Sequence, residues 1–305
     1  MKTISSGIKT SSQRFTDVKE RVVDLVRNKR TQLPTLPVVA QKILELAQDE
    51  DTSARDLEIF IAKDQAIANK VLKLANSSYY GMGRSVDTID RAIMLIGFDE
   101  IVSLTIGMSV FPVLQPGSRQ SLLKMQDLWV HSLGASYAAR RVCSQIDNQI
   151  AFCKKSVFLV SLLHDIGKAI FSIYFPDEYA VVLEEADKNQ VPLYQVEEEL
   201  LGIDHGNMAS MLMHLWNFPE SFIQAVRHHH TPELSEDELH HNALLIQLAN
   251  SLSHAAEIGK SGSPCVDDPL EIGEKLGFLP GYIEDCVEFL RSLRPEISAF
   301  FGTSE

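Results

Sequence analysis

The stretch Leu163-His164-Asp165-Ile166-Gly167-Lys168 lies inside the apolar segment 155–173 and places a histidine beside an aspartate. We predict that this segment forms one long helix. Neighbouring helical residues point about 100° apart, so His164 and Asp165 can both line one cavity between helices. Lys168 follows Asp165 by three residues on the same face, where it forms either a salt bridge with Asp165 or a contact with a bound phosphate group. The stretch therefore predicts a helix with a polar, ligand-binding side.

Helical periodicity extends over the rest of the chain. Apolar residues recur at intervals of three and four in several sets: Val39, Ile43, Leu46 and Ala47; Ile67, Val71, Leu74 and Ala75; Ile89, Ala92, Ile93 and Ile96. No segment alternates strictly between apolar and polar residues, and the βαβ pattern is absent. Together with proline and glycine breaks, the periodicity predicts helices at 38–48, 54–62, 88–96, 121–144, 155–173, 270–276 and 281–298, and one from Pro219 to His230. We therefore predict an all-α fold.

Composition narrows the class of protein. The 305 residues are 45% hydrophobic, which is enough for a substantial core. No run of 18 uncharged apolar residues is present and the first residues do not resemble a signal peptide, so we expect neither a membrane span nor export. The four cysteines are widely spaced, which is typical of reduced thiols in a cytoplasmic protein. A net charge of −13 argues against non-specific nucleic-acid binding.

A series of histidines in the order of a helical metal site surrounds the His164-Asp165 pair. The candidate ligands are His131, His164, Asp165, His205, His229 and His230. Mixed nitrogen and oxygen ligation suits Fe, Mn, Zn or Ni, and the aspartate could bridge two such ions. Asp127 lies four residues before His131, where it could add a carboxylate, orient His131, or simply face solvent. Asp204 is expected to be the N-cap of the helix that begins at His205.

Three sequence blocks resemble the HDOD family, a branch of the HD superfamily found in bacterial signalling proteins. They are Leu33-Pro34-Thr35-Leu36-Pro37; the segment 72–81 with the segment 89–97 that follows it; and 163–168, followed by His205, Trp216 and 226–230. The resemblance implies a multi-helical, HD-domain-like bundle with an N-terminal helical subdomain. It also implies a regulatory role, because HDOD members commonly lack some HD ligands and are often regarded as non-catalytic.

The related HD-GYP enzymes, which hydrolyse cyclic di-GMP, use a similar histidine series. Carried over by position, the resemblance matches their last two histidines to His229 and His230, and their final aspartate to Asn250. Their Gly-Tyr-Pro element is missing. An amide is a poorer ligand for hard cations than a carboxylate, so Asn250 should weaken metal binding or cost the site one of two metals. Of the other histidines, His228 is expected to pack, His214 to lie mid-helix outside the site, and His240, His241 and His254 to lie at the surface.

Four regions are expected along the chain: a helical extension at 1–30, the N-terminal helical part of the HDOD domain at 31–125, the HD-like half with the metal site at 126–257, and a linker with C-terminal helices at 258–305. Segment 259–269 is the expected mobile linker. The glycine-containing loop 76–84 carries Tyr79 and Tyr80, which serve either recognition or packing against the HD-like half.

Three functions remain open at this level. The first is a signalling protein with a metal-binding pocket and little or no hydrolase activity, whose partners would be signalling proteins or a nucleotide-type ligand. The second is a metal-dependent phosphohydrolase acting on a nucleotide or cyclic nucleotide, in which Asp165 helps to hold the metals and Lys168 steadies the phosphate. The third is a structural scaffold without metal.

Overall fold

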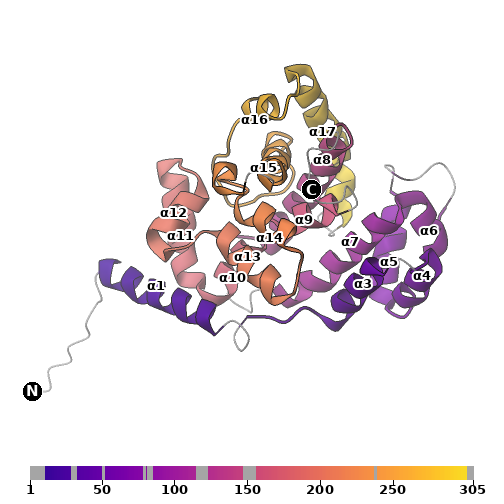
Figure 1. Ribbon diagram of the computed structural model, residues 1–305, viewed down its shortest axis with the longest axis horizontal. Helices are drawn as coiled ribbons and strands as arrows, with labels where there is room; N and C mark the ends of the chain where they lie inside the picture. Colours follow the sequence, from indigo (N-terminus) through magenta and orange to yellow (C-terminus); the bar gives the residue numbers. More distant parts are fainter. Residues whose placement is uncertain are drawn as a thin grey trace, which may run out of the picture.

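The computed structural model describes residues 11–28, 33–49, 52–77, 80, 85–114, 123–146, 156–236 and 239–300. Within these ranges the chain is helical and forms no strand, which confirms the predicted all-α fold. The described helices divide into a group on the right of Figure 1, a central group around the histidines, and flanking helices at the left and top.

The N-terminal group contains five α-helices and a short 3-10 helix. They are α3 (Val38–Gln48), α4 (Ala54–Ile61), α5 (Gln65–Ala75), α6 (Ile89–Ile96), α7 (Phe98–Val110) and η1 (Phe111–Leu114). Polar caps begin several of these helices; for example, the Ser53 side chain accepts from the Asp56 amide while the Asp56 carboxylate accepts from the Ser53 amide. Helix α7 is buried on almost every side, because it packs against α3 and α5 on one side and α9 on the other. It therefore joins the N-terminal group to the central one.

The central and flanking helices are built around α8, which contacts α9, α15 and α17. Their bounds are α8 (Met125–Cys143), α9 (Val157–Leu163), α10 (Ile166–Tyr174), α11 (Pro176–Asn189), α12 (Leu193–Leu201), α13 (His205–Leu215), α14 (Glu220–Arg227), η2 (Pro232–Leu234), α15 (His240–Ala255), α16 (Pro269–Lys275) and α17 (Pro280–Phe300). The N-terminal helix α1 (Ser11–Arg27) lies beside α12 (Figure 1), and Arg21 pairs with Glu178 at 2.8 Å.

The expected helix over 155–173 is present as the helical stretch Val157–Tyr174, but it is interrupted at His164 and Asp165. The chain turns at His164 and Asp165, and separate helices α9 and α10 lie on either side of this turn. Just after this interruption, α10 packs against α13. Gly167 allows that packing, because a Cβ at this position would stand 2.0 Å from the backbone oxygen of His205. The missing side chain brings α10 against the start of α13 and sets His205 beside Asp165.

The same segment is apolar enough to be compared with a membrane span. By length and composition Val157–Tyr174 could cross a bilayer, and so could α6 with the following segment if a pair bent by 114° counted as one span. However, 89% of the Val157–Tyr174 window is buried inside the molecule. Its apolarity is accounted for by the protein core that surrounds Asp165 and Lys168.

Buried polar contacts hold the N-terminal group to the central helices. Glu100 on α7 accepts a hydrogen bond from the Tyr80 hydroxyl and pairs with Arg140 on α8. Tyr80 is buried and its hydroxyl also lies 3.3 Å from that of Tyr137 on α8. Of the two roles considered for this tyrosine, the structure thus shows packing of Tyr80 against the HD-like half. Tyr79 lies outside the described residues. A further link is the Trp216 indole, which donates to the Pro34 carbonyl at 2.9 Å.

The segment expected to be a mobile linker packs closely against α8. The Lys260 amide donates to the Asp127 carbonyl at 3.1 Å, and the Ser261 side chain is buried. Gly259 has φ +61°, and a Cβ there would lie 2.3 Å from the Asp127 oxygen and 2.4 Å from the His131 amide nitrogen. Gly259 therefore permits close approach to the backbone beside His131, whereas the glycine content of the segment suggested flexibility.

Candidate metal centre

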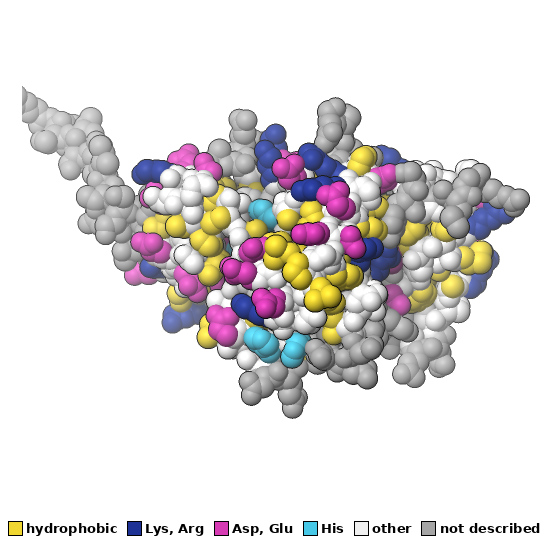
Figure 2. All heavy atoms as spheres, turned by 90° about the horizontal axis from the view of Figure 1, so that it is seen from above, with side chains coloured by type: hydrophobic (Ala, Val, Ile, Leu, Met, Phe, Trp, Pro, Cys, Tyr) yellow, Lys and Arg dark blue, Asp and Glu magenta, His cyan; other side chains and the backbone are white. Residues whose placement is uncertain are grey.

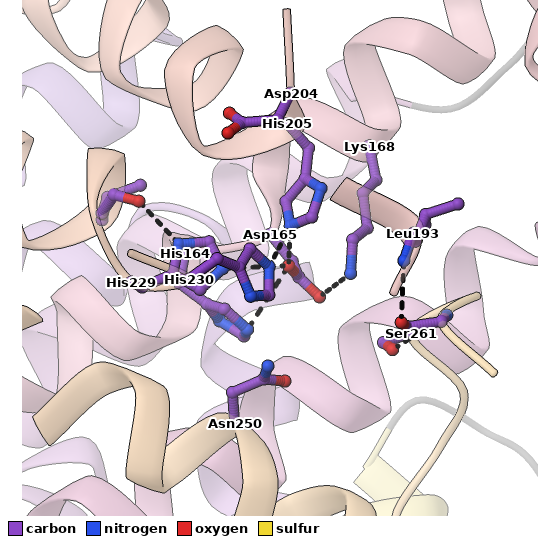
Figure 3. Close-up of polar contacts among 12 residues, drawn as sticks. His164, Asp165, Lys168, Leu193, Asp204, His205, His229, His230, Asn250 and Ser261 are labelled. Carbon is purple, nitrogen blue, oxygen red and sulfur yellow. Dashed lines mark hydrogen bonds and ion pairs between the residues drawn. The ribbon is translucent and has the colours of Figure 1, made fainter. Parts of the chain in front are cut away.

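Five structural elements bring the candidate ligands together (Figure 3). His131 comes from α8. Of the residues labelled in Figure 3, His164 and Asp165 come from the turn between α9 and α10, His205 from the start of α13, His229 and His230 from the turn after α14, and Asn250 from α15. Lys168 of α10 points to the same place. All are at most 3% exposed except His230, which is half-buried. Residues spread over about 120 positions of sequence thus form one enclosed polar cluster.

Asp165 is at the centre of the cluster, and its two oxygens face different partners. Oδ1 lies 3.2 Å from His205 Nε2, 3.5 Å from His164 Nε2 and 3.9 Å from His229 Nε2. Oδ2 accepts from Lys168 Nζ at 2.7 Å and lies 3.9 Å from His131 Nε2. Burial alone would raise the pKa of Asp165, but the neighbouring His164 and Lys168 outweigh it and hold that pKa well below its usual range. Asp165 is therefore a carboxylate at neutral pH.

Backbone carbonyls orient two of the imidazoles. His164 Nδ1 donates to the Ser161 carbonyl at 2.7 Å, and His229 Nδ1 donates to the Val226 carbonyl at 2.6 Å. These partners assign the proton to Nδ1, which leaves each Nε2 as an acceptor aimed at Asp165. Burial lowers the pKa of both rings, which keeps them neutral.

Three buried atoms of this cluster have no hydrogen-bond partner: His164 Nε2, His229 Nε2 and Asp165 Oδ1. Most buried polar atoms in proteins are paired, because leaving one unpaired costs about 1–3 kcal/mol. All three are acceptors with lone pairs directed to the same region, so none can pair with another. A cation would satisfy them together, and the donor set of imidazoles and one carboxylate suits a transition metal. The residues present thus fit a metal.

Glu197 is a site residue that sequence reasoning missed. It lies on α12 and is fully buried, and its Oε2 accepts from His205 Nδ1 at 2.5 Å and from the His205 amide at 2.8 Å. The Tyr179 hydroxyl donates to its Oε1 at 2.7 Å. This pattern fixes His205 with Nε2 toward Asp165. The sequence did contain one indication of its role: Glu197 shares the apolar face of α12 with Leu193, Val196 and Leu201, and a charged residue buried there needs a partner.

Glu197 also changes the charge of His205. Burial opposes protonation of the imidazole, but the adjacent Glu197 carboxylate outweighs it and raises the pKa of His205 to about 9. In the absence of a metal, His205 is therefore protonated at neutral pH and shares that proton with its neighbours. His230 Nε2 lies 2.9 Å from His205 Nε2, and the pKa of His230 is lowered by burial.

Asn250 faces His131 directly. Asn250 Oδ1 lies 2.9 Å from His131 Nε2, so position 250 does adjoin the site. His254, expected at the surface, is half-buried one turn later on α15, with its ring centroid 5.0 Å from that of His131. Its Nε2 lies 2.6 Å from the Ser261 hydroxyl, and burial lowers the pKa of His254 to about 4. The expectation for His254 is therefore wrong, because the packed segment after α15 covers it.

The other residues singled out in the sequence include some that match the expectation and some that lie outside the site. Asp204 caps α13 as expected and accepts from the Asn207 amide. His214 is exposed, and His228 is half-buried at the end of α14. Asp127 is half-buried in the first turn of α8. Among the described residues, two groups of donor atoms lie within 4.8 Å of one another, His131 with His164 and Asp165, and His205 with His229 and His230. Asp127 belongs to neither group.

Comparison with known proteins gives the family. The sequence pattern of the HDOD domain matches residues 33–232, which is most of the chain, so the protein belongs to the HDOD domain family. An uncharacterized protein of Treponema pallidum is 22% identical over 225 residues. The match covers 72% of this chain but only 43% of that protein.

Solved structures share the fold. An HDOD domain protein of unknown function from Geobacter sulfurreducens is 22% identical and superimposes with a TM-score of 0.73 over 92% of this chain and 97% of its own. A candidate signal transduction protein from Marinobacter aquaeolei is 20% identical, with a TM-score of 0.76 over 95% of this chain and 66% of its own. A candidate metal-dependent phosphohydrolase from Shewanella amazonensis is 19% identical, with a TM-score of 0.64 over 94% of this chain and 99% of its own. At these identities the similarity shows the fold alone.

Proposed function

We propose that this HDOD protein is a bacterial regulatory module whose HD-type pocket binds a transition metal and has little or no hydrolase activity. Its partners would be other signalling proteins or a nucleotide-type ligand. The observation that carries the metal-binding part is the convergence of three buried, unpartnered acceptors, His164 Nε2, His229 Nε2 and Asp165 Oδ1, on one place. A metal there would offset the cost of burying them, so its binding energy would also stabilise the fold.

The enclosure of the site supports a role without rapid turnover. A bound metal would supply Lewis-acid chemistry and an activated water, but a hydrolase must also admit its substrate. Here His131, His164, Asp165, Lys168, His205 and His229 are at most 1% exposed. The half-buried His230 stacks on Tyr194, with ring centroids 4.6 Å apart and planes 11° apart. A phosphoester could reach Asp165 only after some of these side chains had moved.

The charges around Asp165 also argue against rapid turnover. Asn250 adds no negative charge at the position beside His131, and Lys168 already neutralises Asp165. The pocket thus has few carboxylates to bind the metal ions that hydrolysis of a phosphoester requires.

The alternative function is a metal-dependent phosphohydrolase acting on a nucleotide or cyclic nucleotide. One observation favours it: Lys168, a buried cation, lies beside the proposed metal position, where it could bind a phosphate oxygen. In that case Lys168 would have to exchange its bond to Asp165 for one to the substrate, and the Tyr194–His230 stack would have to open.

Two measurements on the full chain separate these functions. Protein purified without chelator and reconstituted with Mn²⁺, Fe²⁺, Zn²⁺ or Ni²⁺ is assayed for bound metal and for turnover of a panel of phosphoesters that includes cyclic nucleotides. We expect bound metal, with no turnover above that of a His164→Asn variant. Metal-dependent turnover that is lost in Lys168→Met would instead establish the phosphohydrolase. Failure to bind any of the four metals would contradict the metal-binding part of the proposal.

A further inference from the structure

The two oxygens of Asp165 have unequal surroundings, and this asymmetry bears on how many metals the site holds. Three imidazole Nε2 atoms face Oδ1, at 3.2, 3.5 and 3.9 Å. Facing Oδ2 are the ammonium group of Lys168 at 2.7 Å and His131 at 3.9 Å. A carboxylate that bridges two metals offers one oxygen to each, so the Oδ2 side is where a second metal would bind.

That second position is already filled by a positive charge. Lys168 is 1% exposed and donates directly to Oδ2. A divalent cation on Oδ2 would either displace the ammonium group or stand within a few ångströms of it. Like charges about 4 Å apart in a protein interior repel by several kcal/mol even at an effective dielectric constant of about 20. No carboxylate other than Asp165 faces this place from the described part of α8 or α15, since Asn250 offers only an amide and Asp127 belongs to neither donor group.

The histidine on the Oδ2 side is also engaged. His131 Nε2 lies 2.9 Å from Asn250 Oδ1. The amide oxygen accepts a hydrogen bond from Nε2, or, if the amide is turned over, its nitrogen donates one to Nε2; in either orientation a metal on His131 would have to break this bond. By contrast, His164 Nε2 and His229 Nε2, both facing Oδ1, are unpartnered.

We infer that the pocket holds a single metal ion, on the Oδ1 side of Asp165, and that the Lys168 ammonium takes the place of a second cation on the Oδ2 side. This inference rests on the metal-binding function proposed above. The ligands would be Asp165 Oδ1 and the unpartnered Nε2 atoms of His164 and His229. His205 and His230 would join them after giving up their mutual contact at 2.9 Å, and His205 would release its extra proton. His131 would stay paired with Asn250. A site whose ligands are supplied almost entirely by the protein resembles a structural metal site more than a catalytic one.

The first test is an isothermal calorimetric titration of the chelator-treated full chain with Zn²⁺, with elemental analysis of the loaded protein. We expect one equivalent in the wild type. His131→Asn and His229→Asn are matched variants, because each removes one buried imidazole. His131→Asn should still bind one equivalent, within about threefold of the wild-type affinity. His229→Asn should lose affinity by more than about 100-fold, since even outer-sphere partners of a metal ligand contribute 10–100-fold.

The second test needs no variant and covers the case in which one of them fails to fold. X-ray absorption at the zinc edge of the loaded wild-type protein should show imidazole and carboxylate scattering and no metal–metal distance of about 3.5–4 Å, the separation in two-metal sites. Two equivalents of metal, a metal–metal distance in this range, or an equal loss of affinity in the two variants would overturn the single-metal assignment while leaving metal binding intact. No binding at all would overturn the proposed function itself.

Discussion

Glu197 offers a sharp test of how the pocket is organised. Its Oε2 accepts from both the amide and Nδ1 of His205, and it is fully buried. Glu197→Gln keeps the shape of the side chain and an oxygen for His205, but it removes the negative charge. A hydrogen bond to a charged group contributes about 1.5–3 kcal/mol and a neutral one about 0.5–1.5 kcal/mol. The expected loss is therefore about 1–1.5 kcal/mol, or roughly tenfold in metal affinity.

The assay is calorimetric titration of the chelator-treated protein with Zn²⁺, with circular dichroism and thermal melting in parallel to follow the fold. Glu199→Gln is the matched control, because Glu199 lies on the same helix and is exposed. A folded Glu197→Gln protein whose metal affinity stays within about twofold of the wild type would refute the argument that Glu197 orients His205. A fall in melting temperature without a change in metal affinity would assign Glu197 a purely structural role.

Three further predictions follow from the same contacts. Asn250→Asp places a carboxylate beside His131 on the Oδ2 side, so the protein should take up a second equivalent of metal and bind total metal at least about tenfold more tightly; an unchanged titration would show that the missing charge at position 250 is not what limits the site to one metal. Tyr80→Ala removes a buried ring and a hydrogen bond to Glu100, so the melting temperature should fall by about 5 °C or more; an unaltered melting curve would rule out the packing role of Tyr80. In metal-free protein, the pKa of His205 is raised from 6.5 to about 9. The stabilisation from its pairing with Glu197 is therefore complete below pH 6.5 and is lost as the pH rises through 9. NMR titration should show a histidine with this raised pKa, and the pKa should fall in Glu197→Gln; a wild-type spectrum without such a histidine would contradict the pairing.

The sequence predicted the fold class and most helices because these depend on local signals. Apolar periodicity placed α3, α6, α16 and α17 within a few residues of their observed bounds. It did not show the interruption at His164 and Asp165, since neither residue breaks a helix, nor the close approach of Gly167 to the backbone of His205. It also failed at 259–269, where Gly259 allows close packing against α8 although the composition of the segment suggested a linker.

The candidate site, too, could be predicted only in part from the sequence. The histidine order, the His164-Asp165 pair and the resemblance to the HDOD family together selected residues that the structure brings together, and the resemblance decided for His229 and His230 over His228. Sequence order could not show which Asp165 oxygen each group faces, since that depends on the turn at 164–165. For Glu197 the sequence offered only a charged residue on the apolar face of α12 and could not show its contact with His205, nor could it place His254 under the segment that follows α15.

The most direct test of the account is a crystal structure of the Zn²⁺-reconstituted protein with anomalous data collected at the metal edge. The account predicts one strong anomalous peak, about 2 Å from Asp165 Oδ1 and within ligand distance of the histidine Nε2 atoms facing it, with Lys168 still bonded to Oδ2. A pocket without an anomalous peak would contradict metal binding, and a second peak beside Oδ2 with Lys168 displaced would contradict the single-metal site.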